Sequence, residues 1–198
     1  MPNFVDQFEK DVAKFYGAPY AVATDCCTHA IELSLRLTDY NNITVPPHTY
    51  IGVPFILIKL NKNWSWNNQS WVNYYYLGNT NIIDAAVYWK PNSYVPGTLM
   101  CLSFQFKKHL NTIRGGMILT DSLESYQRLQ RMSYDGRRKD IPWAEQNISE
   151  IGYHYYMTPE TAQLGLERLP IAIDTSDQAR VRSYQDYPYL PAMQVFQS

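Results

Sequence analysis

The chain has 198 residues and a formal net charge of −1, which suits one domain with a sizeable core. With no basic run, it offers nucleic acid no surface to bind. Its three cysteines form neither a disulfide framework nor a zinc motif, so a reduced compartment and no metal site are expected. The N-terminus lacks the features of a signal peptide, and no apolar run is long enough to span a bilayer. We therefore expect no membrane partner and a place in the cytoplasm, or in the host cytoplasm if the protein is viral.

The hydrophobic pattern predicts helices that alternate with short strands in the first part of the chain. The expected elements are a helix at 4–16, a strand at 20–25, a helix within 26–37, and a strand, a Pro-Pro turn and a further helix within 42–60. Gly17 would end the first helix, and Thr28 would cap the second. The aromatic segment 63–77 has no clean periodicity, and we do not place it.

The second part of the chain continues this alternation. The expected elements are a buried strand ending at Asp84, a strand within 97–105 ending near Ser103, a strand within 115–121, and helices at 122–132 and 158–169. The two strands on either side of Lys107 and Lys108 would form a hairpin. Strands that alternate with helices indicate α/β layering.

Four polar residues fall at predicted strand ends or helix starts: Thr28, Asp84, Ser103 and Lys108. Ligands of open α/β sheets bind beyond the carboxyl ends of the strands, so these side chains are expected to converge. Thr28 at a helix N-terminus is a natural phosphate seat, although most such residues are plain caps. Asp84, among apolar neighbours, either needs a cationic or hydrogen-bonding partner or satisfies the backbone at a strand end.

Two adjacent lysines, Lys107 and Lys108, stand where the chain turns back into a predicted core. Their position needs an explanation, because the charge of a lysine is costly to bury. Either both are solvated turn residues, or one of them has a chemical role. Desolvation lowers the pKa of a lysine, and its neutral amine can then form a Schiff base with an aldehyde. A buried acid such as Asp84 at a nearby strand end favours the chemical role.

The order of several motifs resembles the DegT/DnrJ/EryC1/StrS family of sugar aminotransferases, which are fold-type-I enzymes that use pyridoxal 5'-phosphate (PLP). The motifs are "FEKDVAKFYGAPYAVATDCCTHAIELSL", "VPPHTY", "IIDAA", "SFQFKKHLNTIRGGMILTD" and "GYHYYMTPETAQLGLERL". The most specific part is the Ser-Phe-x-x-x-Lys-x-x-x-x-x-x-Gly-Gly stretch with an upstream Asp-Ala-Ala. The resemblance runs intermittently from Phe8 to Leu169.

The resemblance implies roles for the lysine and the acid. In the family pattern the Schiff-base lysine lies five residues after the serine, which is Lys108 and not Lys107 when counted from Ser103. Lys108 would hold PLP and then shuttle the proton during transfer. Asp84 would lie against the pyridine nitrogen and keep it protonated, so that the ring can act as an electron sink.

The remaining cofactor-binding residues are implied in the same way. Thr28 and Ser103 would bind the phosphate together with the backbone N–H of His29. Tyr50 matches the aromatic residue that stacks on the cofactor ring, with a core aromatic at a helix start as the alternative. His154 stands where the family has an asparagine that reaches the phosphate of the partner subunit. The resemblance therefore implies a homodimer with shared active sites.

Besides His154, several positions depart from the family pattern, including Tyr156, where the family has an arginine. Cys26-Cys27-Thr28 replaces Ser-Gly-Thr at the phosphate turn, and losing that glycine costs backbone freedom where the chain approaches the phosphate. Val87 stands in place of a glutamine or histidine, and the glycine pair follows Ile113-Arg114 rather than Gly-Glu.

The implied fold is a three-layer α/β/α sandwich, the large domain of fold type I, truncated, with the small C-terminal domain largely missing. Residues 1–170 would form a minimal PLP-binding large domain and residues 171–198 a short C-terminal remnant, since family members are much longer. The segment 51–83 also looks too short for the usual two intervening strands.

The resemblance implies transfer of an amino group from an amino-acid donor, glutamate or glutamine, to a nucleotide-linked keto-sugar. One alternative is a degenerate homologue that acts as a non-catalytic binding or structural protein. Another is a PLP-dependent sugar dehydratase, in which a histidine typically replaces the lysine, and His109 stands beside Lys108.

Overall fold

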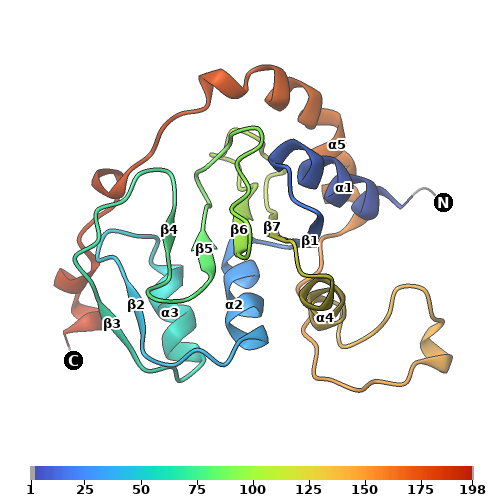
Figure 1. Ribbon diagram of the computed structural model, residues 1–198, viewed down its shortest axis with the longest axis horizontal. Helices are drawn as coiled ribbons and strands as arrows, with labels where there is room; N and C mark the ends of the chain where they lie inside the picture. Colours follow the sequence, from blue (N-terminus) through green and yellow to red (C-terminus); the bar gives the residue numbers. More distant parts are fainter. Residues whose placement is uncertain (1–2, 198) are drawn as a thin grey trace.

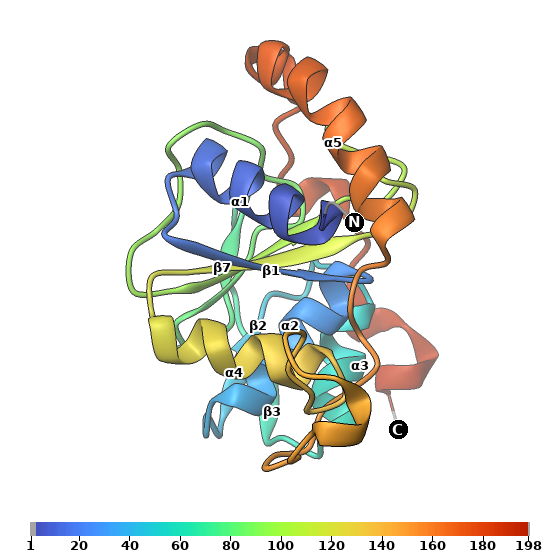
Figure 2. The same ribbon diagram turned by 90° about the vertical axis from the view of Figure 1, so that its right-hand side faces the viewer.

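The computed structural model describes residues 3–197, in which a five-stranded mixed β-sheet lies between two layers of helices (Figure 1). The helices are α1 (Phe4–Tyr16), α2 (Cys27–Leu37), α3 (Gly52–Lys59), α4 (Leu123–Ser133) and α5 (Pro159–Asp174). The strands are β1 (Tyr20–Thr24), β2 (Ile43–Val45), β3 (Trp64–Trp66), β4 (Tyr75–Tyr76), β5 (Ile82–Asp84), β6 (Leu99–Ser103) and β7 (Gly116–Thr120). Figure 2 shows α1 and α5 on one face of the sheet and α2, α3 and α4 on the other. The three-layer α/β/α arrangement predicted from the sequence is confirmed.

The strand order brings the ends of β5 and β6 and the start of α2 to the same end of the sheet. The order is β1-β7-β6-β5-β4, and β7 runs antiparallel to both β1 and β6. Strand β5 is parallel to β6, with Asp84 opposite Cys101. Strands β1, β5 and β6 therefore point the same way. The carboxyl ends of β5 and β6 and the start of α2, which follows β1, lie at the edge where α/β proteins bind ligands.

Helix α1 shows how local sequence signals set the bounds of an element. Asn3 caps its start by accepting a hydrogen bond from the Asp6 N–H, and Gly17 ends it with a left-handed φ of 76°. Its apolar stripe includes Phe8, which is fully buried in the core layer that α1 shares with α5. Gly165 of α5 permits this contact, because a Cβ there would lie 2.6 Å from the Phe8 ring.

Two sequence-based expectations are wrong. Helix α2 begins at Cys27 because Cys26 is still extended (φ −163°, ψ 161°) and is the N-cap residue, so Thr28 lies inside the first turn and is not the cap. The segment 51–83 also contains two strands, contrary to expectation. Strand β3 pairs with β2 in a separate parallel sheet, and β4 pairs with β5 at the sheet edge. Strands of two or three residues are too short to show a period-2 pattern.

The other predicted elements are confirmed, including the hairpin of β6 and β7. Helix α5 starts with Pro159 in its first turn but runs on to Asp174, past Pro170. Tertiary packing keeps this last part helical, because Ala172 is buried in the core. Within residues 3–197, no helix combines the length and the apolar character needed to cross a membrane.

Residues 175–197, here called the strap, run from the end of α5 along the sheet edge to the neighbourhood of α3 and β3 (Figure 1). The Leu190 N–H donates to the Pro47 carbonyl at 2.9 Å, and the Leu190 side chain is buried. Near its end, Phe196 packs on Trp66 with ring centroids 5.2 Å apart. The strap is therefore anchored at both of its ends, by α5 and by its contacts with Pro47 and Trp66. Between these ends it forms one wall of a cavity.

Glu9 makes the stability of this fold depend on pH. Burial raises the pKa of its carboxyl from 4.5 to about 7, against the effects of Lys139 and of the Ala23 N–H that donates to it at 2.7 Å. Because the folded protein holds this proton more tightly than the unfolded chain, the contribution of Glu9 to stability is full below pH 4.5 and is lost as pH rises to about 7. The loss is expected to be about 3 kcal/mol.

This loss is measurable by urea denaturation across that pH range. Glu9→Gln should make the slope clearly smaller while its amide oxygen still accepts the Ala23 N–H. The control is Glu124→Gln on the exposed side of α4, which should keep it. A wild-type stability that rises between pH 4.5 and 7 while Glu9→Gln stays flat would contradict the assignment.

Candidate active site

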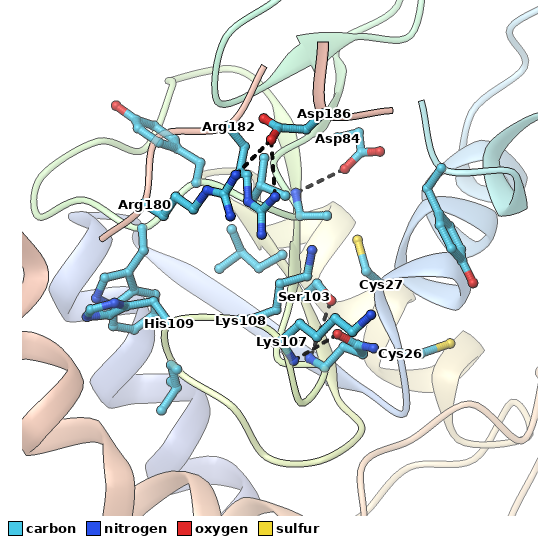
Figure 3. A pocket seen from close by; sticks show the side chains of 18 of the residues that line it. Cys26, Cys27, Asp84, Ser103, Lys107, Lys108, His109, Arg180, Arg182 and Asp186 are labelled. Carbon is cyan, nitrogen blue, oxygen red and sulfur yellow. Dashed lines mark hydrogen bonds and ion pairs between the residues drawn. The ribbon is translucent and has the colours of Figure 1, made fainter. Parts of the chain in front are cut away.

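A cavity of about 700 Å³ lies where the ends of β5 and β6, the start of α2 and the strap meet. Its walls carry most of the residues predicted to form the site, drawn in Figure 3 with their neighbours. The predicted residues that line it are Thr28, Tyr50, Asp84, Ser103 and Lys108. Residues far apart in the sequence thus converge as expected from strand polarity.

Lys108 comes from the loop between β6 and β7, and its side chain extends into the cavity towards Cys27 and Asp84 (Figure 3). Burial lowers the pKa of the Lys108 amine, and the nearby Cys27 and Asp84 oppose this effect. Its neighbour Lys107 is exposed at the cavity rim. The two lysines therefore differ, and Lys108 is the one placed to present a neutral amine to a ligand.

Asp84 ends β5 and is buried on the cavity wall. Its Oδ1 accepts the Ala86 N–H at 3.0 Å, and its Oδ2 accepts the Tyr75 hydroxyl at 2.7 Å. Because Tyr75 gives its proton to Asp84, the Thr49 hydroxyl must be the donor in the contact between Thr49 and Tyr75. Burial raises the pKa of Asp84, against these hydrogen bonds and the charge of Lys108. A cation bound beside Asp84 would favour its ionised form.

The start of α2 lines the same cavity and could hold an anion. Among the described residues, no side chain caps this helix at Cys26, so the first-turn N–H groups are open to a ligand. The side chains of Cys27 and Thr28 line the cavity beside them. Ser103, at the end of β6, adds a hydroxyl whose oxygen accepts the Gln105 N–H at 3.4 Å.

Gly116 permits this seat to lie close to the sheet. A Cβ at Gly116 would collide with the backbone of Cys26 and Cys27, closer than side-chain atoms approach backbone in proteins. Gly116→Ala is therefore expected to lower the free energy of unfolding by about 1–3 kcal/mol and to push away the start of α2. Thermal denaturation of this variant and of the wild type tests this. A Gly116→Ala variant as stable as the wild type would contradict the close packing.

The side chains of His29 and His154 are not brought to the cavity. The His29 ring turns back to Asp25, with Nδ1 2.6 Å from its carboxylate, and stacks on Tyr155. Despite burial, the hydrogen bonds to Asp25 and Cys26 raise the pKa of His29 to about 9. Its backbone N–H lies in the first turn of α2, as expected for a residue at the helix start, and its predicted phosphate contact stays a prediction.

His154 lies exposed on the surface, where its Nδ1 is 3.1 Å from a carboxylate oxygen of Asp135.

A candidate metal site lies at the start of α2, where Asp25, Cys26 and His29 are close enough together to hold a metal ion. However, the Arg114 guanidinium already pairs with Asp25 at 2.7 Å, and its charge would repel a cation.

Sequence reasoning missed several cavity residues. They are Thr49, Tyr75, Arg180, Arg182, Asp186 and Tyr187. Tyr75 stands in a run of tyrosines that β-propensity alone explains, and the strap has no periodicity from which its path could be inferred. The departures Cys27, Val87 and Arg114 also line the cavity, so this chain changes the chemistry of the wall at these positions.

A family model described as the DegT/DnrJ/EryC1/StrS aminotransferase family matches residues 1–63 and 95–188. The comparison with curated proteins found no match. Among solved structures, AtS13 from Actinomadura melliaura is similar with a TM-score of 0.76 at 19% identity, covering 90% of this chain and 61% of that chain.

Two further structures are a sugar aminotransferase, CalS13, from Micromonospora echinospora and PseC from Helicobacter pylori, an aminotransferase involved in the biosynthesis of pseudoaminic acid. Their TM-scores are 0.74 and 0.65, both at 15% identity. The matches cover 88% and 85% of this chain, but only 62% and 58% of those chains. These likenesses confirm the fold class. The chain spans about three fifths of the length of the structures it matches.

Proposed function

Since this chain belongs to the DegT/DnrJ/EryC1/StrS aminotransferase family, we propose that it is itself a PLP-dependent aminotransferase. The observation that carries the proposal is that Lys108, the buried Asp84 and the uncapped start of α2 line one cavity. An amine, a buried acid and an anion seat are the three groups that PLP needs. When bound, PLP supplies an electron sink for the carbon that exchanges its amino group.

The residues of the cavity fit this cofactor. Asp84 would hold a proton on the pyridine nitrogen, and this positive charge would stabilise the buried carboxylate. Tyr75 and Ala86 fix the orientation of that carboxylate through their hydrogen bonds. Thr28, Ser103 and the first-turn N–H groups of α2 would hold the phosphate.

Lys108 would have two roles in the reaction. Its lowered pKa increases the fraction of neutral amine, which is the form that can attach to the cofactor aldehyde. The Lys108 amine would also be the group that accepts a proton from the substrate carbon that carries the amino group. Tyr50 lines the cavity but is 59% exposed, which suits an aromatic ring that covers a bound cofactor.

The amino donor would be glutamate or glutamine, and the acceptor a nucleotide-linked keto-sugar. The cationic character of the cavity supports anionic substrates of this kind. Five basic side chains line it against two acidic ones, namely Lys107, Lys108, Arg114, Arg180 and Arg182 against Asp84 and Asp186. The similarity to sugar aminotransferases favours a sugar acceptor.

We further propose a homodimer with shared active sites. His154 is 71% exposed and would contact the phosphate bound by a second copy, as its motif position implies. The three free cysteines fit the reducing cytoplasm. Sedimentation of the PLP-loaded protein tests the assembly, because a monomer with full cofactor occupancy would exclude a shared site.

The alternative of a dehydratase with a catalytic histidine has less support. The Nε2 atom of His109 lies 3.1 Å from the Ala172 carbonyl and 3.1 Å from the Thr175 hydroxyl, which hold the ring against the end of α5. Lys108 instead extends towards Asp84. A non-catalytic homologue would have no physical need for a half-buried lysine beside a buried acid.

The proposal is tested with purified protein, PLP and single amino acids. The PLP-loaded protein should absorb near the edge of the visible range. Adding glutamate or glutamine should shift this band to that of the amine form, and a keto-sugar nucleotide should restore it. Alanine serves as the control amino acid. A stable PLP band that no amino acid shifts would reduce the protein to a cofactor-binding homologue.

A further inference from the structure

Two arginines of the strap share a single acid at the cavity wall. Arg180 Nη2 lies 3.1 Å from Asp186 Oδ1, and Arg182 Nη1 lies 3.2 Å from the same oxygen. One carboxylate cannot neutralise two guanidinium groups. This group of three side chains therefore keeps one positive charge in excess, and each guanidinium retains N–H donors for a further anion.

Asn73, which precedes β4, holds the backbone of Arg182 at both its carbonyl and its N–H. The Asn73 N–H donates to the Arg182 carbonyl at 2.7 Å, and the Arg182 N–H donates to Asn73 Oδ1 at 3.4 Å. Asp186 is itself fixed by the Ser183 N–H at 2.9 Å. The Arg182 side chain is only 31% exposed, whereas that of Arg180 is 69% exposed. A guanidinium held in advance loses little entropy when it binds an anion.

Arg182 also acts on the reacting lysine. Figure 3 shows Arg180, Arg182 and Asp186 gathered on one side of the cavity, with the Lys108 side chain extending between them and Cys27. Consistent with this proximity, the charge of Arg182 adds to burial, the main cause of the lowered pKa of Lys108, whereas Cys27 and Asp84 oppose it. An anion bound by Arg182 therefore lies near the atoms that exchange the amino group.

We propose that Arg182, assisted by Arg180, binds the carboxylate next to the amino group of the amino-acid donor and so orients that donor at Lys108. This inference rests on the proposed function. The donor carboxylate is one bond from the carbon that carries the amine, whereas the diphosphate of a nucleotide sugar lies further from the keto carbon. A carboxylate also matches the bidentate fork of a guanidinium.

Binding can be measured apart from the reaction by titration calorimetry of the PLP-loaded protein. Succinate is the probe for a carboxylate, because it has no amino group to react, and uridine diphosphate is the probe for a diphosphate. Arg182→Gln should weaken succinate binding about tenfold or more. The control Arg138→Gln, at an exposed pair with Asp140, should leave both probes within twofold of the wild type.

Arg182→Lys keeps the charge but not the fork, so it should bind succinate with an affinity between those of the wild type and Arg182→Gln. An Arg182→Gln variant with unchanged succinate binding, or with only uridine diphosphate weakened, would overturn the proposal. Circular dichroism and the visible band of the variant show that it is folded and loaded. Loss of the PLP band in the wild type would instead refute the proposed function itself.

Discussion

Replacing Lys108 by alanine is expected to abolish the visible absorbance of the PLP-loaded protein and to reduce amino-group transfer by about 10²–10⁴-fold. In the proposed function Lys108 would supply both the covalent attachment and the proton transfer, and it is the lysine whose side chain extends towards Asp84 inside the cavity. Absorbance spectra and single-turnover rates with the amino donor measure the two effects separately.

Lys107→Ala is the matched control, since Lys107 is the adjacent residue but is exposed at the rim. It should keep the absorbance band and most of the activity. The assignment would be reversed if Lys107→Ala lost the band while Lys108→Ala retained it.

Asp84→Asn is expected to lower the rate of amino-group transfer and to raise the stability of the cofactor-free protein. The amide has nearly the shape of the carboxylate, so it should keep the cavity intact, but it cannot hold a proton on the pyridine nitrogen through its charge. We expect transfer to fall by about 10²–10³-fold, the range found when a preorganised electrostatic contact is removed. Single-turnover kinetics at saturating PLP measure this loss.

The same substitution should stabilise the cofactor-free protein at neutral pH. Burial raises the pKa of Asp84 above its usual value of 3.8, so ionisation favours the unfolded chain as pH rises through the raised pKa. Denaturation of the cofactor-free protein at pH 7 should show a higher midpoint for Asp84→Asn than for the wild type. Asp39→Asn, at an exposed position, is the control and should change neither quantity. An Asp84→Asn variant with normal transfer rates would contradict the role of the acid.

The fold was largely predictable because its longer elements carry local signals. Helix α1 has an apolar stripe and ends at Gly17, and β6 and β7 are continuous apolar runs on either side of the lysine loop. The short strands β3 and β4 carry no such signal, because their pairing depends on partners distant in the sequence. The start of α2 depends on the extended backbone of Cys26, which side-chain preference for Thr28 as a cap did not reveal.

The site was predictable to the extent that its residues lie at strand ends within recognisable motifs. Asp84, Ser103 and Lys108 belong to this group, and one cavity does contain them. The strap residues Arg180 and Arg182 could not be foreseen, because they reach the cavity through tertiary anchoring of an irregular segment. Such contacts leave no periodic trace in the sequence.

The central claim is the covalent link between Lys108 and the cofactor, and it can be located directly. The PLP-loaded protein is reduced with borohydride, digested, and sequenced by mass spectrometry. We expect the pyridoxyl-phosphate mass on Lys108, with Lys107 unmodified in the same peptide. A label on Lys107 or on other surface lysines, or no label on a protein that binds PLP, would contradict the assignment of Lys108 as the residue that holds the cofactor.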